Sequence, residues 1–269
     1  MNSGKKNLEF KHDLYFFARR NFLLFKNIFF AKKNHKFLFI LSPPYSGSTL
    51  LTQIISTSKK ISCNNYIATM EGQLLPELRN HMFNKDRWDK SNIYDWYKIK
   101  SVWLKYWDQS KTILMDKTTT NIMRFDEIKK EFNNTYAICL VRNPYAVVEG
   151  IIRRNSKPIE FAIEFVIKTL RYQKYNIENN KNLIWIKYSE LCDNQDLVNK
   201  KINTILPEID DLDFNKFFSA HNFKNKPLKI TNLNDEKISK LKKRDISKIN
   251  KYFLKEKELL QFFNFQIIK

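Results

Sequence analysis

A short turn between two apolar stretches is the part of this sequence best suited to bind an anion. Residues 37–41 (FLFIL) are continuously apolar, residues 42–48 form a Ser/Pro/Gly turn, and Thr49 begins a second apolar stretch. A strand, a tight turn and a helix in this order direct unpaired backbone N–H groups and the positive end of the helix dipole to one point. A phosphate fits there, so the sequence predicts nucleotide chemistry.

The turn lacks the lysine that nucleoside triphosphatases place on the terminal phosphates. Their loop reads GxxxxGK[ST], whereas Gly47 is followed here by Ser48 and Thr49. A kinase acting on a nucleotide or small molecule is therefore a weak alternative, and the chain also has no recognisable aspartate–Mg²⁺ signature.

A second anion-binding element follows another apolar strand. Residues 136–141 (YAICLV) precede Arg142, and Pro144 suits the first turn of the helix that comes next. An arginine at the carboxyl end of a strand offers a planar fork that can bind a phosphate through two hydrogen bonds. The carboxyl ends of parallel strands share one edge of a sheet, so both elements are expected to line one site.

The two elements together resemble the donor-binding motifs of sulfotransferases that use 3′-phosphoadenosine 5′-phosphosulfate (PAPS). The family's 5′-phosphosulfate loop has patterns such as PKSGTTxL or PRSGSTLL, and residues 43–51 read PPYSGSTLL. Its 3′-phosphate element is a strand, then Arg, Asn or Asp, and Pro, with a serine eight residues after the arginine. That serine position is Gly150 here. The resemblance covers roughly residues 37–207 and is closer to the bacterial and Golgi branches than to the cytosolic steroid and phenol branch.

The resemblance implies that PAPS is the sulfuryl donor, that adenosine 3′,5′-bisphosphate is the product and that no metal takes part. Tyr188, near a strand end, is either beside the adenine or 3′-phosphate or an ordinary aromatic at a strand end. The residues implied to bind the donor are Tyr45, Ser46, Gly47, Ser48, Thr49, Arg142, Gly150 and Tyr188.

Sulfuryl transfer to a hydroxyl or amine needs a base for the acceptor proton and a cation for the charge on the transferring group. Lys117 follows a predicted strand and resembles the lysine that faces the sulfuryl group in the family. The cytosolic branch places its histidine base two residues later, where this chain has Thr119. The predicted base is instead Glu71, in a Glu-Gly step similar to that of the Golgi branches, with His221 as the next candidate. A glutamate favoured by a helix dipole is the alternative interpretation of Glu71.

Tyr45 is the main departure from the family pattern. The family has lysine or arginine at this position, where it stabilises the oxygen that leaves with the phosphate. Tyrosine carries no charge at neutral pH but can donate one hydrogen bond. We therefore expect either a slow enzyme, with Tyr45 as a catalytic residue, or a degenerate relative that binds the nucleotide without turnover.

These residues must be positioned by an α/β domain with a parallel sheet, because short apolar strands alternate with helical stretches. Strands are expected at 36–41, 61–64, 112–115, 136–141 and 183–188, and helices at 49–58, 73–82, 93–107, 123–132, 145–155, 159–176 and 196–205. We expect a basic amphipathic segment at 1–35, the sulfotransferase core with its nucleotide-kinase-like fold at 36–210, and a helical Lys-rich extension packed on it at 211–269.

Composition sets the remaining expectations. Forty-eight Lys and Arg against 28 Asp and Glu give a formal charge of +20, which suits an anionic donor and also fits a simple compositional bias. No basic run with interleaved aromatics indicates nucleic-acid binding. Three cysteines without metal or redox spacing favour a reducing cytoplasm. Residues 14–33 are expected to form a helix packed on the domain, or alternatively a weak contact with an acidic membrane surface. The acceptor stays open: a small molecule, a lipid or a carbohydrate.

Overall fold

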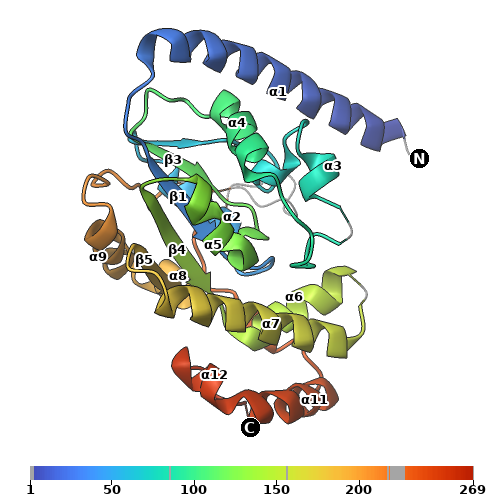
Figure 1. The fold of residues 1–269 in the computed structure, drawn as a ribbon. Helices are drawn as coiled ribbons and strands as arrows, with labels where there is room; N and C mark the ends of the chain where they lie inside the picture. Colours follow the sequence, from blue (N-terminus) through green and yellow to red (C-terminus); the bar gives the residue numbers. More distant parts are fainter. Residues whose placement is uncertain (1–2, 85, 156, 217, 219–227, 269) are drawn as a thin grey trace.

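A five-stranded parallel sheet forms the centre of the protein (Figure 1). The computed structural model describes residues 3–84, 86–155, 157–216, 218 and 228–268. The spatial order of the strands is β2 (Ile61–Cys63), β3 (Ile113–Asp116), β1 (Lys36–Leu41), β4 (Thr135–Val141) and β5 (Leu183–Lys187). Every neighbouring pair is parallel, which confirms the predicted fold class. After β1 the chain forms β2 and β3 on one side of β1, and then crosses to form β4 and β5 on the other side. The carboxyl end of β1 is therefore at a topological switch point, where sheets of this kind bind ligands.

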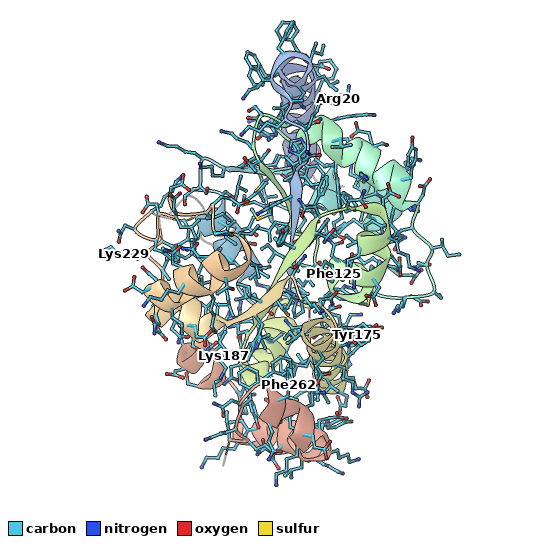
Figure 2. The ribbon with its side chains drawn as sticks, turned by 60° about the vertical axis from the view of Figure 1, so that its left-hand side comes forward. Arg20, Phe125, Tyr175, Lys187, Lys229 and Phe262 are labelled. Atoms are coloured by element: carbon cyan, nitrogen blue, oxygen red, sulfur yellow. The ribbon has the colours of Figure 1, made fainter. Side chains whose placement is uncertain are left out.

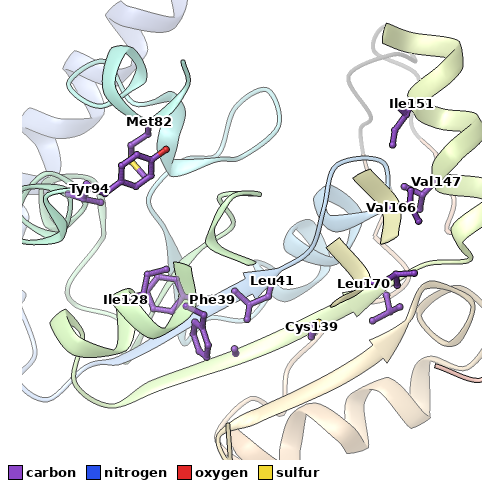
Figure 3. Close-up of a cluster of buried hydrophobic side chains, with 14 of the residues drawn as sticks. Phe39, Leu41, Met82, Tyr94, Ile128, Cys139, Val147, Ile151, Val166 and Leu170 are labelled. Atoms are coloured by element: carbon purple, nitrogen blue, oxygen red, sulfur yellow. The ribbon is translucent and has the colours of Figure 1, made fainter. Parts of the chain in front are cut away.

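Helices cover both faces of the sheet, because successive side chains of β1 point to opposite faces. Phe37, Phe39 and Leu41 belong to one buried cluster, and Leu38 and Ile40 to another. Figure 3 shows the first cluster around Phe39 and Leu41. This first face is covered by α4 (Trp96–Tyr106), α5 (Asn121–Glu131), α6 (Pro144–Asn155) and α7 (Ile159–Glu178), and the second by α2 (Ser48–Ile55), α8 (Tyr188–Asp193) and α9 (Gln195–Ile205).

Helical segments at the two ends of the chain pack on this domain. Helix α1 (Ser3–Phe30) contacts α4. The C-terminal segment contains α10 (Asn234–Ile238), which contacts α6, and α11 (Lys243–Phe253), η2 (Leu254–Glu256) and α12 (Lys257–Phe262), of which α11 and α12 contact α7. Figure 1 shows α1 at one end of the molecule and α11 and α12 at the other. Among the described residues, no helix combines the length and apolarity needed to cross a bilayer.

The segment 73–82 was predicted as one helix, and this prediction is wrong. It forms a 3₁₀ turn, η1 (Gly72–Leu74), and a separate short helix, α3 (Arg79–Met82). Pro76 lacks an N–H group and disfavours the helical conformation of the residue before it; Leu75 is indeed extended, with φ −60° and ψ 142°. The other predicted strands and helices of the core occur within three residues of their expected ends.

Candidate functional site

The turn after β1 brings its backbone close to the carboxyl end of β5. Gly47 caps α2 with φ 91°, in the left-handed region that favours glycine. A Cβ atom on Gly47 would lie 2.6 Å from the Tyr188 ring, so a side chain is also excluded sterically. Ser46 Oγ is buried and has no hydrogen-bond partner among the described residues. A buried hydroxyl left unpaired beside a helix amino end is well placed to bind a ligand oxygen.

Arg142 is fixed by three contacts and keeps one nitrogen unused. Its Nε donates to Asn234 Oδ1 at 2.8 Å, its Nη1 donates to the Tyr45 backbone oxygen at 3.1 Å, and its Cζ lies 3.8 Å from the centroid of the Tyr188 ring. Its Nη2 is buried with no hydrogen-bond partner in the described part of the chain. Burial lowers the pKa of Arg142, which means that the desolvated cation lacks full compensation. An anion bound at Nη2 would supply it.

Lys237 of α10 approaches the position at which the family has a serine. A Cβ atom on Gly150 would lie 3.2 Å from Lys237 Nζ and 3.0 Å from Tyr45 Cβ. Lys237 Nζ lies 3.4 Å from Glu149 Oε2. Burial, followed by the positive charge of Arg142, lowers the pKa of Lys237 to about 8. The C-terminal segment thus places a second cation beside Arg142.

Glu71 and Lys117, predicted from separate segments, form a buried ion pair. Lys117 Nζ lies 3.2 Å from Glu71 Oε1 and 3.5 Å from Thr49 Oγ1 at the amino end of α2. Thr119 Oγ1 donates to Glu71 Oε2 at 3.4 Å, and Gln73 Nε2 also donates to this oxygen. Thr119 occupies the position of the histidine base of the cytosolic branch, and here it donates a hydrogen bond to Glu71, the residue predicted to replace that base.

Asp116, to which no role was assigned from the sequence, holds the segments that carry this pair. Its carboxylate is fully buried and accepts hydrogen bonds from Asn64 Nδ2 (2.8 Å), Gly72 N (3.0 Å), Thr118 N (2.8 Å) and Asn121 Nδ2 (2.7 Å). A Cβ atom on Gly72 would lie 2.2 Å from Asp116 Oδ1, so glycine is required beside Glu71. An aspartate directly before the lysine at a strand end was the available sequence signal.

One arginine lies near the ring of Tyr45, whose backbone is left-handed with φ 68°. Arg154 Cζ is 5.5 Å from the centroid of the Tyr45 ring. The structure therefore places the cation of Arg154 near the position where the family's lysine or arginine is missing. His221, the alternative base, lies outside the described residues.

The predicted residues thus form two groups at the carboxyl edge of the sheet: Glu71, Lys117 and Thr49 in one, and Arg142, Tyr45, Gly150 and Tyr188 in the other. Ser46, Gly47 and Ser48 belong to the turn and helix start between them. Within the described residues, no group of three or more His, Cys, Asp or Glu is arranged to hold a metal ion.

A surface cavity of about 570 Å³ lies elsewhere, against α7, and involves none of these residues. Three of its charged groups have partners within the protein: Arg171 Nη2 lies 2.6 Å from Glu256 Oε1, and Lys168 Nζ donates to the Trp88 backbone oxygen at 2.9 Å. The unpaired polar atoms at the strand ends make that edge the better candidate site.

Comparison with known proteins identifies the family and the fold. The model of the sulfotransferase family matches residues 38–202, more than half of the chain. Among solved structures, the sulfotransferase domain from the curacin biosynthetic pathway is similar with a TM-score of 0.56 and 18% identity, covering 88% of this chain and 100% of that one. The sulfotransferase domain of the Synechococcus PCC 7002 olefin synthase gives 0.54 and 18%, covering 83% and 96%. A sulfotransferase from Alicyclobacillus acidocaldarius gives 0.50 and 10%, covering 88% and 97%. These likenesses show a shared fold. No curated protein sequence matches the chain.

Proposed function

This chain belongs to the sulfotransferase family, and we propose that it transfers a sulfuryl group from PAPS to a hydroxyl or amine of a small-molecule, lipid or carbohydrate acceptor. The observation that carries the proposal is the buried Glu71–Lys117 pair, which contacts the amino end of α2 through Thr49. A base, a cation and an anion-binding helix end are thereby placed within one connected set of contacts, as in-line group transfer to an acceptor requires.

The unpaired buried atoms fit a donor with phosphates at two positions. Ser46 Oγ and the N–H groups at the start of α2 would bind the 5′-phosphosulfate, and Arg142 Nη2 with Lys237 would bind the 3′-phosphate. PAPS, when bound, supplies the activated sulfuryl group. The phosphate charge would satisfy two cations that burial now leaves undercompensated.

The ion pair suggests how the chain's residues share the chemistry. Glu71, held by Thr119 and Gln73, would accept the proton of the acceptor. Lys117 lies between Glu71 and Thr49, so it can neutralise charge that develops at the amino end of α2 without leaving its place. Asp116 fixes the backbone on both sides of the pair, which keeps base and cation oriented.

Nucleotide preference followed by turnover tests the function. We expect tighter binding of adenosine 3′,5′-bisphosphate than of AMP or of ATP with Mg²⁺, and transfer of label from PAPS labelled in its sulfuryl group to acceptors in extracts. Preference for ATP with Mg²⁺ would indicate a kinase. Binding of the bisphosphate without transfer to any acceptor would indicate a degenerate relative.

Variants of Tyr45 separate a slow enzyme from a degenerate one. If the phenol donates a hydrogen bond in the transition state, Tyr45→Phe should lower turnover at least tenfold, up to the two to three powers of ten typical of a lost preorganised donor. Nucleotide affinity should change little, and Tyr45→Arg serves as the matched variant that restores the family's cation. A silent Phe variant together with activity gained by the Arg variant would contradict a catalytic role for Tyr45.

Lys237 predicts a pH dependence of nucleotide binding. Its pKa is lowered by burial to about 8 in the free protein, and a bound phosphate would raise it. Binding above pH 8 then requires proton uptake, so affinity for adenosine 3′,5′-bisphosphate should fall roughly three- to tenfold between about pH 7 and 9. Lys237→Met should bind more weakly at pH 7 and lose most of this slope, as titration calorimetry can measure. An unchanged slope in the variant would exclude Lys237 from the phosphate site.

A further inference from the structure

Helix α1 carries many large apolar side chains that no other part of the described structure covers. Sixteen large hydrophobic side chains are exposed in the described residues, and nine of them lie on this one helix. Phe22, Phe25 and Phe29 are 65%, 67% and 65% exposed, and Ile28 is 75% exposed. Single exposed apolar residues are ordinary, but a contiguous exposed patch marks a surface that binds something.

Six of these nine exposed side chains lie opposite the face that packs on the domain. Phe16 and Leu23 are buried, and Arg19 donates to the backbone oxygens of Cys63 and Tyr106. At 100° per residue, Phe25 points about 160° away from Leu23. We call these six side chains the outer stripe; they fall within an arc of about 140° over a length of about 22 Å. They are Leu14, Phe17, Phe22, Phe25, Ile28 and Phe29. Figure 2 shows side chains projecting from α1 away from the rest of the molecule.

Charges surround the outer stripe without interrupting it. Between residues 14 and 29 only Ala18 and Asn21 share its arc, and neither is charged. Arg20 and Lys26 lie at its borders, each with a side chain 30% exposed, and pair with Glu77 and Asp108. Exposed Lys11 precedes the stripe, and exposed Lys32 and Lys33 follow it. Residues 3–33 contain eight Lys or Arg and two acidic residues.

We propose that the outer stripe inserts into the surface of an anionic lipid bilayer and holds the protein there, with α1 lying in the plane of the membrane. An apolar face bordered by cations is the arrangement of interfacial helices, whose apolar side enters the acyl boundary while lysines and arginines meet anionic headgroups. Charge distinguishes this occupant from a second copy of the chain. Pairing two stripes would bring together two molecules that each carry a formal charge of +20, whereas an anionic bilayer complements that charge.

Vesicle sedimentation with the full chain tests the proposal. The protein should partition at least tenfold more strongly into vesicles of phosphatidylcholine with about one quarter phosphatidylglycerol than into phosphatidylcholine alone. The triple variant Phe22→Ser, Phe25→Ser, Phe29→Ser should lose at least tenfold of the partitioning into anionic vesicles. The matched control removes three comparably exposed side chains elsewhere, by Ile93→Ser, Tyr97→Ser and Leu254→Ser, and should partition like the wild type.

Each other outcome overturns the proposal. Equal partitioning of the two triple variants would mean that net charge alone binds the vesicles. A wild-type dimer in light scattering that becomes a monomer in the Phe triple variant, without vesicle binding, would assign the stripe to a second copy. In both variants the melting temperature and the affinity for adenosine 3′,5′-bisphosphate should stay unchanged, because all six positions are exposed and distant in sequence from the site residues. These two measurements establish that the fold is intact.

Discussion

Replacing Glu71 with glutamine should lower kcat by about two to four powers of ten, because the amide keeps the shape of the side chain but cannot accept the acceptor's proton. Affinity for adenosine 3′,5′-bisphosphate should stay within a few-fold of the wild type. The reason is that the Glu71 carboxylate is paired with Lys117, at 3.2 Å, and not with Arg142 or Lys237, the residues proposed to bind the 3′-phosphate. Single-turnover kinetics with labelled PAPS, alongside calorimetric nucleotide titration, measures both quantities.

The hydrogen bonds around Glu71 provide the control. Thr119→Val removes one donor to Glu71 Oε2, at 3.4 Å, and leaves the carboxylate in place, so its effect on kcat should be about tenfold or less. Glutamine at position 71 also leaves Lys117 without a buried counter-charge, and a melting temperature separates this loss of stability from the loss of catalysis. Normal turnover by the Glu71→Gln enzyme would assign the base elsewhere, with His221 the next residue to replace.

The local part of this site could be predicted from the sequence because each piece follows a strand. Apolar runs ending at Leu41, Asp116 and Val141 identify three strands, and parallel strands leave whatever follows them at one edge. That logic alone places the turn at 42–48, Lys117 and Arg142 together. Glu71 required the family resemblance, since a Glu-Gly step after a three-residue strand has no distinctive pattern of its own.

The contributions of the C-terminal segment could not be predicted in the same way. Asn234 and Lys237 reach Arg142 and Gly150 from more than eighty residues away, through packing of α10 on α6. No spacing rule links a short polar helix to a strand end so distant in the chain. The wrong prediction of a single helix at 73–82 has a local cause instead. Pro76 is present in the sequence, and its effect on the backbone of Leu75 could have been predicted from it.

Replacing Arg142 with alanine should weaken binding of adenosine 3′,5′-bisphosphate by about 2–4 kcal/mol, or roughly 30- to 1000-fold, the value of a charge-assisted fork. Nη2 is the one nitrogen of this guanidinium that is buried without a partner in the described structure, and Nε and Nη1 already bond Asn234 and the Tyr45 backbone. Affinity for AMP, which lacks the 3′-phosphate, should barely change.

The difference between the two nucleotides is what identifies the role, because Arg142 also supports its surroundings. Its guanidinium lies on the Tyr188 ring and bonds the backbone of the turn at Tyr45, so truncation can loosen the 5′-phosphosulfate loop as well. Such loosening would weaken AMP and the bisphosphate equally, and that result would assign Arg142 a structural role. Arg142→Lys keeps the charge but loses the planar fork and the contact to Asn234. The affinity of this variant for the bisphosphate should therefore lie between those of the wild type and of Arg142→Ala. An affinity as low as that of the alanine variant would mean that the geometry of the fork, and not its charge, selects the 3′-phosphate.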